Sequence, residues 1–153
     1  MKHLNKSAQA IFETLTDGLV DVSESNFPEK QTHRTFGEDG GAFMAVHVER
    51  IRETEWGPIY SIAHYYKQNG DMVCDPDMTF LLAKTDGLAY PLTFEQGGML
   101  YQESVVWSDD EQRIASYHPK MQRDQTSFAN KWMMNIGDQQ GLTPCCVGSK
   151  LAK

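Results

Sequence analysis

The spacing of apolar residues changes twice along the chain, and each change marks a different kind of secondary structure. In the first turns of the chain, apolar positions recur three or four residues apart, which predicts an amphipathic helix over about residues 5–17. Asn5 or Ser7 can cap its start and Gly18 can end it. The residues that share its apolar face are Leu4, Ala8, Ile11, Phe12, Leu15 and Leu19.

No regular period extends over residues 21–41. The sequence therefore predicts a loop of about 20 residues, which is longer than most connections in a compact domain. We expect this loop to be either mobile or functional. The residues that interrupt any helix or strand there are Phe27, Pro28, Gly37, Gly40 and Gly41.

Alternating, β-branched and aromatic runs follow this loop and predict a meander of about five strands. Short turn sequences separate the runs, and Asn69-Gly70-Asp71 is the strongest of them because Asn and Gly tolerate positive φ. Sequential strands joined by short turns pair antiparallel. The predicted strands are residues 42–52, 59–66, 78–83, 90–94 and 100–107, with a further short run at 114–117.

From Pro119 onward the helical period returns, and Gly141 suits the end of that helix. Apolar residues again recur three or four apart, as in Phe128 and Trp132. The order of elements is helix, meander, helix, which predicts an α+β domain with both helices on one face of an antiparallel sheet. We expect a single domain over residues 1–142 and a flexible tail over residues 143–153.

The charge balance limits the classes of partner. The chain has 14 Lys and Arg against 21 Asp and Glu, a net charge of −7. A nucleic-acid binder uses an excess of cations to displace phosphate counterions, so this balance argues against DNA or RNA binding, and also against anionic membranes. It is compatible with a basic protein partner, and equally with a requirement for solubility alone.

Cysteine usage and hydropathy indicate the compartment. Cys74 and the adjacent pair Cys145-Cys146 give an odd count without a C-x-x-C spacing, so a reducing cytoplasm and no zinc site are expected. The chain has no apolar run of the ~20 residues that a membrane span needs, and its first residues show no secretory signal. The sequence predicts no cofactor and leaves the oligomeric state open.

One stretch, residues 64–80, concentrates side chains that could carry chemistry. His64 precedes the Asn69-Gly70 turn, and the acidic residues Asp71, Asp75 and Asp77 follow it. Converging carboxylates and an imidazole could hold a divalent ion, and a His–Asp pair could act as a base. The spacing is not that of a calcium loop, and turn formation by Asp71 and Asp75 explains the same residues.

Other motifs give little support to an enzyme. The chain contains no G-x-S-x-G, P-loop, G-x-G-x-x-G or H-E-x-x-H sequence. Cys74 could form a dyad with His64 only if the fold brings the two together. No catalytic residue is therefore assigned.

Two further features could serve binding. Trp56 lies at a predicted hairpin tip, where an exposed tryptophan is a favoured interface anchor, although it could also pack back over the sheet. The acidic groups Glu38-Asp39 and Asp109-Asp110-Glu111 could face a basic partner or lie in solvated turns.

The sequence resembles a domain of unknown function found in proteins of plasmids, conjugative elements and phages. The resemblance rests on an H-Y-x-x-x-N-G-D-x-x-x-D-P-x-M signature, a P-L-x-F run followed by Y-Q-E, and an F-x-x-x-W-x-x-N-I run that ends near Q-G. It covers roughly residues 8–142 and implies a bacterial mobile-element protein, without implying catalytic residues. The matching residues are His64, Tyr65, Asn69, Gly70, Asp71, Asp75, Pro76, Met78, Pro91, Leu92, Phe94, Tyr101, Gln102, Glu103, Phe128, Trp132, Asn135, Ile136, Gln140 and Gly141.

Two hypotheses of different classes follow. The first is a non-enzymatic protein-interaction domain of a mobile element, for which a counter-defence or regulatory inhibitor of a host protein is one concrete form. The second is a metal-binding or hydrolytic domain that uses the residues clustered around the turn. The candidate binding residues are His64, Asn69, Asp71, Asp75, Asp77 and Trp56.

Overall fold

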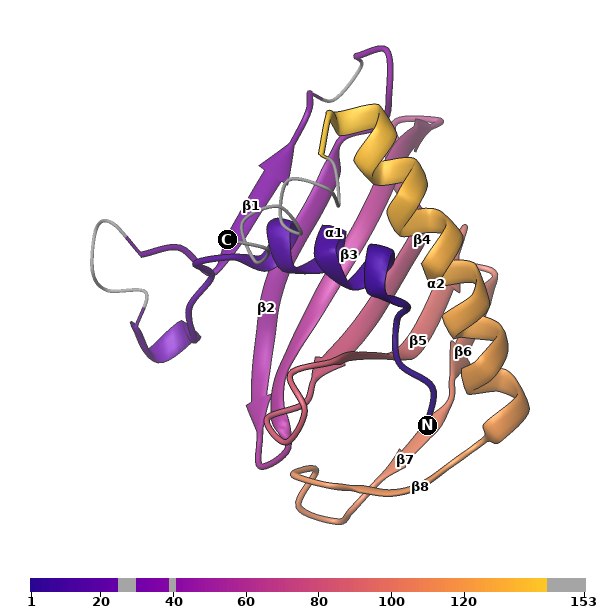
Figure 1. The fold of residues 1–153 in the computed structure, drawn as a ribbon. Coiled ribbons are helices and arrows are strands. Elements are labelled where there is room, and N and C mark those ends of the chain that lie inside the picture. The colour runs from indigo at the N-terminus through magenta and orange to yellow at the C-terminus, as the bar shows by residue number, and fades with distance from the viewer. Residues whose placement is uncertain (25–29, 39–40, 143–153) are drawn as a thin grey trace.

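A six-stranded antiparallel sheet carries both long helices on one of its faces (Figure 1). The computed structural model describes residues 1–24, 30–38 and 41–142. The strands follow the order β1-β2-β3-β4-β5-β6, so each one pairs with its neighbour in the sequence. The α+β class and the meander are therefore confirmed, with six strands in the sheet.

The elements have the following bounds. The sheet consists of β1 (His33–Phe36), β2 (Val46–Thr54), β3 (Gly57–Gln68), β4 (Asp71–Leu82), β5 (Ala89–Gln96) and β6 (Leu100–Glu103). A two-stranded ribbon is formed by β7 (Val105–Trp107) and β8 (Ile114–Tyr117). The helices are α1 (Lys6–Thr16), the short 3-10 helix η1 (Val22–Glu24) and α2 (Pro119–Gln140).

Both predicted helices are confirmed, together with their end signals. The Asn5 side chain accepts a hydrogen bond from the Ala8 N–H at 2.9 Å and so caps α1. Pro119 occupies the first turn of α2, where its missing N–H has no cost. Gly141 ends α2 in the left-handed conformation (φ 70°), which glycine adopts without a steric penalty.

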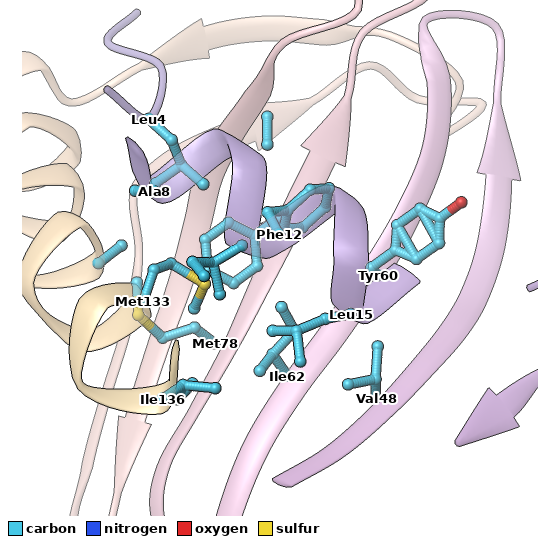
Figure 2. Packing of buried hydrophobic residues seen from close by; sticks show 14 of the residues in the cluster. Leu4, Ala8, Phe12, Leu15, Val48, Tyr60, Ile62, Met78, Met133 and Ile136 are labelled. Atoms are coloured by element: carbon cyan, nitrogen blue, oxygen red, sulfur yellow. The ribbon is translucent and has the colours of Figure 1, made fainter. Parts of the chain in front are cut away.

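The main core lies between the helices and the sheet (Figure 2). Phe12 of α1 packs against Tyr60 of β3 and Phe80 of β4, with ring centroids 5.7 and 5.3 Å apart. Met133 and Ile136 of α2 fill the adjoining space and are fully buried. Each such side chain contributes roughly 1.5–3 kcal/mol of hydrophobic stabilisation, so this layer fixes both helices on one face.

A second, smaller core lies on the other side of the sheet, beneath the ribbon. The Ser104 N–H and hydroxyl both donate to the Leu92 carbonyl, at 2.8 and 2.9 Å, at the point where the chain passes from β6 to β7. The ribbon then covers only one end of this face. The buried residues of the second core are Ile59, Leu81, Leu92, Val105 and Ile114.

Three sequence predictions need correction. Residues 21–41 were expected to form a loop, but they include η1 and the strand β1, which has four residues of which only Phe36 is apolar, too few to show an alternation. The third predicted strand begins at Asp71 rather than Met78, because a register shift opposite Ala63 and Tyr65 accommodates Pro76. The predicted strand 100–107 is divided at Ser104 into β6 and β7.

Two expectations fall outside these elements. The predicted tail, residues 143–153, lies outside the described residues. Over the part of the chain that is described, no helix is long and apolar enough to cross a membrane.

Candidate functional site

The β3–β4 hairpin distributes the sequence-predicted candidates over different surfaces. Asn69 and Gly70 form its turn with φ values of 53° and 87°, and Asp71 follows at the exposed start of β4. Trp56 precedes β3 and therefore lies at the opposite end of that strand from Asn69. The structure does not gather these residues into one site.

His64 lies on the helix-covered face and is 5% exposed. Trp132 of α2 donates its indole N–H to His64 Nδ1 at 3.4 Å, and the two rings meet edge to face. The other ring nitrogen, Nε2, is buried without a hydrogen-bond partner among the described residues. Burial lowers the pKa of His64, an effect that the nearby Asp75 opposes.

Asp75 is the one predicted carboxylate close enough to His64 to act on its charge. Its Oδ1 atom accepts a hydrogen bond from Gln96 Nε2 at 2.7 Å. Asp77, only two residues further on, pairs in register with Ala63 and points to the opposite face of the sheet from His64. Cys74 pairs with Tyr65, so its side chain also points away from His64.

This separation leaves no metal centre around the hairpin. In residues 1–24, 30–38 and 41–142, no group of three or more His, Cys, Asp or Glu residues is arranged to hold a metal ion. Of the three carboxylates in this segment, Asp71 lies next to the turn, Asp75 lies in the bulge and Asp77 lies on the sheet face opposite His64.

The face of the sheet opposite the helices is polar over most of its width. Because side chains alternate along each strand, the strand register places two rows of side chains on this side. We call this surface the open face. The first row is His33, Glu49, Ser61, Thr79, Thr93 and Glu103, and the second row is Thr35, His47, Ala63, Asp77, Glu95 and Tyr101.

Four carboxylates lie on the open face: Glu49, Asp77, Glu95 and Glu103. None of them forms an ion pair with a Lys, Arg or His that the structure describes. Burial raises the pKa of Asp77, and the negative charges of Glu95 and Glu49 raise it further, while a hydrogen bond from Ser61 opposes both effects. The charges of this face therefore repel one another.

A hollow of about 290 Å³ lies within the open face, beside the ribbon. Arg52 of β2 reaches into it and stacks its guanidinium over the Trp107 ring, 4.4 Å from the ring centroid. The same guanidinium donates a hydrogen bond to the Glu111 carbonyl at 2.8 Å. The hollow is lined by Ile51, Arg52, Ile59, Asp77, Thr79, Leu92, Thr93, Glu95, Tyr101, Glu103, Trp107 and Glu111.

Of the open-face residues, sequence reasoning identified only Asp77. Glu49 and Glu103 lie inside runs that were interpreted as strands, so their alternation with buried neighbours was the available signal. Glu95 lies one residue beyond the predicted strand 90–94, because the observed strand β5 extends to Gln96. Alternation alone places them on one side of each strand. Only the register between strands shows that all four carboxylates share the same side.

Trp56 lies at the β2–β3 tip, as the sequence predicts, and 41% of its surface is accessible. Two backbone hydrogen bonds fix its position: its N–H donates to the Thr54 hydroxyl, and its carbonyl accepts from the Lys84 N–H. It borders an apolar cleft of about 580 Å³ on the other side of the ribbon from the hollow. The other residues of this cleft are Met1, Leu81, Ala83, Thr85, Tyr90, Ile114, Ala115, Ser116 and Tyr117.

Comparison with known proteins identifies one related family. A family model described as a domain of unknown function (DUF6908) matches residues 21–142, which include every strand and α2. No curated protein and no solved structure gives a significant match to the chain.

Proposed function

The chain belongs to a family defined by a domain of unknown function (DUF6908), and we propose that it is a non-enzymatic protein-interaction domain whose open face binds a positively charged surface of another protein. The observation that carries this proposal is the set of four carboxylates, Glu49, Asp77, Glu95 and Glu103, none of which forms an ion pair with a described Lys, Arg or His.

An arrangement of this kind lowers the stability of the free protein. Like charges on neighbouring strands repel each other, and burial of Asp77 disfavours its ionised form. A cationic partner would neutralise the repulsion and would be attracted over a distance of about one Debye length, ~8–10 Å.

The open face also has the shape and composition of a binding surface. Tyr65 and Tyr101 present aromatic rings beside the carboxylates, and aromatic residues are enriched at protein interfaces. On the opposite face, α1 and α2 pack over the main core, so the side without helices is the one more open to a partner.

The resemblance to proteins of mobile elements suggests what kind of partner the open face would bind. A mobile-element protein with an acidic face would suit a host protein whose own surface is basic, as the surfaces of nucleic-acid-binding proteins are. We therefore propose a counter-defence or regulatory inhibitor as the concrete role.

Two variants with the same change of charge test the proposal. The open-face variant combines Glu49→Gln, Asp77→Asn, Glu95→Gln and Glu103→Gln. The helix-side variant combines Glu13→Gln, Asp17→Asn, Asp124→Asn and Asp138→Asn, all on exposed helical or helix-end positions. Proteins captured from bacterial lysate by the wild-type chain are purified, and their affinities for all three proteins are measured across a salt series.

We expect a captured partner to lose at least tenfold in affinity for the open-face variant and to keep its affinity for the helix-side variant. Its affinity for the wild-type protein should fall as salt increases, because the attraction is electrostatic. If every captured protein binds the two variants equally, the open face is not the interaction surface and the proposal is wrong.

The metal-binding or hydrolytic alternative makes a different prediction. An ion that binds only the folded state raises the melting temperature by mass action. The placement of His64 and Asp77 on opposite faces favours no such effect from Mg²⁺, Mn²⁺, Ca²⁺ or Zn²⁺. A rise of several degrees that is abolished by Asp75→Asn would favour the alternative.

A further inference from the structure

We propose that the hollow on the open face receives an arginine side chain of the partner protein, so that the partner is recognised through an arginine-containing segment and not through positive charge alone. This inference rests on the proposed function and adds the chemistry of recognition to it.

A guanidinium group has two requirements that an ammonium group does not share. It is planar, so it binds carboxylates through two parallel hydrogen bonds, and it is weakly hydrated, so it stacks on aromatic rings. A lysine ammonium is a compact and strongly hydrated charge. A site built for arginine therefore places carboxylates next to an aromatic surface.

The hollow supplies both features. Asp77 and Glu95 are cross-strand neighbours on β4 and β5, and Glu95 is in turn aligned with Tyr101 on β6. The Tyr101 ring is 60% exposed, so its surface is available to an incoming group. A guanidinium lying over Tyr101 would therefore find Glu95 on the adjoining strand β5 and Asp77 one strand further on, on β4.

The chain itself already seats one guanidinium in the hollow. Arg52 stacks on Trp107 at 4.4 Å and donates to the Glu111 carbonyl at 2.8 Å. It forms no ion pair within 4 Å with Asp77, Glu95 or Glu103. The hollow can therefore hold a stacked guanidinium. Because Arg52 forms no ion pair with the carboxylates of the hollow, they remain available to a second guanidinium.

The size of the hollow favours a single side chain. Its volume of about 290 Å³ lies at the lower limit of small-molecule pockets, which start at roughly 300 Å³. Its lining combines apolar side chains, such as Ile59 and Leu92, with the Thr79 and Thr93 hydroxyls, which lie 2.6 Å apart in a mutual hydrogen bond. An apolar side chain would leave the carboxylates without compensation, whereas an arginine tip provides donors to them.

Hexa-arginine and hexa-lysine peptides, which carry equal side-chain charge, test this inference by calorimetry with the full chain. A double variant, Glu95→Gln with Tyr101→Ala, alters the hollow at exposed or half-buried positions. Asp17→Asn with Asp138→Asn serves as the control on the helix side. Circular dichroism and thermal melting establish that each variant is folded.

We expect hexa-arginine to bind the wild-type protein at least tenfold more tightly than hexa-lysine. This preference should disappear in the Glu95→Gln/Tyr101→Ala variant and persist in the helix-side control. Equal affinity for the two peptides, with both weakened by the open-face variant, would overturn the arginine inference and leave the proposed function standing. If each peptide binds the open-face variant and the helix-side variant with the same affinity, both proposals are wrong.

Discussion

Ser61 donates a hydrogen bond from its hydroxyl to Asp77 Oδ1 across the β3–β4 pair, at a distance of 2.9 Å. Among the described residues, no other hydrogen bond or ion pair reaches this carboxylate. A single neutral donor does not compensate the burial of a negative charge that also faces Glu95 and Glu49, so the pKa of Asp77 is raised.

The raised pKa has a definite consequence for stability. At a pH above the raised pKa, Asp77 is ionised in the folded protein, and its charge lowers the free energy of unfolding because it is less favourable there than in the unfolded chain. At a pH below the unfolded pKa, near 3.8, Asp77 is protonated in both states and this loss of stability is absent. Asp77→Asn, which keeps the acceptor for Ser61, should therefore stabilise the protein at pH 7 by ~1 kcal/mol, or roughly 2–4 °C in melting temperature. The gain should vanish near pH 3.

Asp110 is the matched control for this prediction. Its carboxylate is fully exposed, and the pKa of Asp110 is lowered by hydrogen bonds from Ser108 and the Gln112 N–H and by the charge of Arg113. Asp110→Asn should therefore give no stabilisation at pH 7. Melting curves of both variants at several pH values test the sign, and equal shifts for the two would contradict this account of Asp77.

The contact between Trp132 and His64 predicts a second pH effect. Because burial lowers the pKa of His64, the unfolded chain takes up a proton at higher pH than the folded protein does. Stability should then fall as the pH decreases from about 7 through the unfolded value of 6.5 and on to the lowered folded pKa. His47 adds to this lowering and Asp75 opposes it.

Replacement of the imidazole isolates this effect. His64→Gln retains an acceptor for the Trp132 indole N–H but cannot be protonated in this range. The variant should lose the decline in unfolding free energy that we expect between pH 7 and pH 5 in the wild-type protein, and denaturant titrations of both proteins measure this difference. An unchanged decline would mean that another group is responsible.

The elements of this fold could be predicted where the signal is local. The helix ends at Asn5, Pro119 and Gly141 follow from caps and backbone preferences within one turn. The strand β1 could not be predicted, because it pairs with β2 over only four residues and its single apolar side chain, Phe36, cannot show an alternation although it packs against the main core. Edge strands of this kind depend on tertiary structure.

The structure separates the residues of the sequence-predicted cluster for a related reason. His64, Asp75 and Asp77 are close in sequence, and their proximity suggested one centre. In a strand, however, neighbours in sequence point to opposite faces, while residues from four different strands share one face. The four carboxylates of the open face become neighbours only through the register of the sheet. They are Glu49, Asp77, Glu95 and Glu103.

Gln122 illustrates a third contribution that has no sequence signature. Its side chain is 1% exposed, accepts from the Lys2 N–H at 2.7 Å, and donates to the carbonyls of Lys2 and Pro91 at 2.7 and 3.2 Å. It thereby joins the N-terminal segment, β5 and α2. Gln122→Leu leaves the Lys2 N–H and the Pro91 carbonyl without this partner, and leaves the Lys2 carbonyl with only the 3.3 Å hydrogen bond from Thr126. It should cost about 2–3 kcal/mol.

Gln139→Leu, at an exposed position on the same helix, is the control and should change stability by less than about 0.5 kcal/mol. Hydrogen exchange of the Leu4 amide, which donates to the Ala89 carbonyl at 2.9 Å, adds a local readout. We expect faster exchange at Leu4 in the Gln122 variant. If the Gln122→Leu variant has the same exchange rate at Leu4 and the same stability as the wild-type protein, Gln122 does not hold the N-terminal segment.

Gly137 lies in the last turns of α2, where helix propensity alone favours alanine by ~1 kcal/mol. The packing gives the opposite expectation. A Cβ atom at this position would lie 2.8 Å from Ile11 Cδ1 of α1 and 2.7 Å from the Leu142 carbonyl oxygen. Both Ile11 and Gly137 are buried, so the two helices would have to separate.

Gly137→Ala should therefore destabilise the protein, because the steric cost of overpacking, typically 1–3 kcal/mol, exceeds the gain in propensity. Asn135→Ala changes an exposed position on the same helix, and there the propensity gain should appear without a steric cost. Denaturant titrations of the two variants should thus shift in opposite directions. A stabilising Gly137→Ala would mean that α1 can move away from α2 without loss, and that the contact at Ile11 does not fix the distance between the helices.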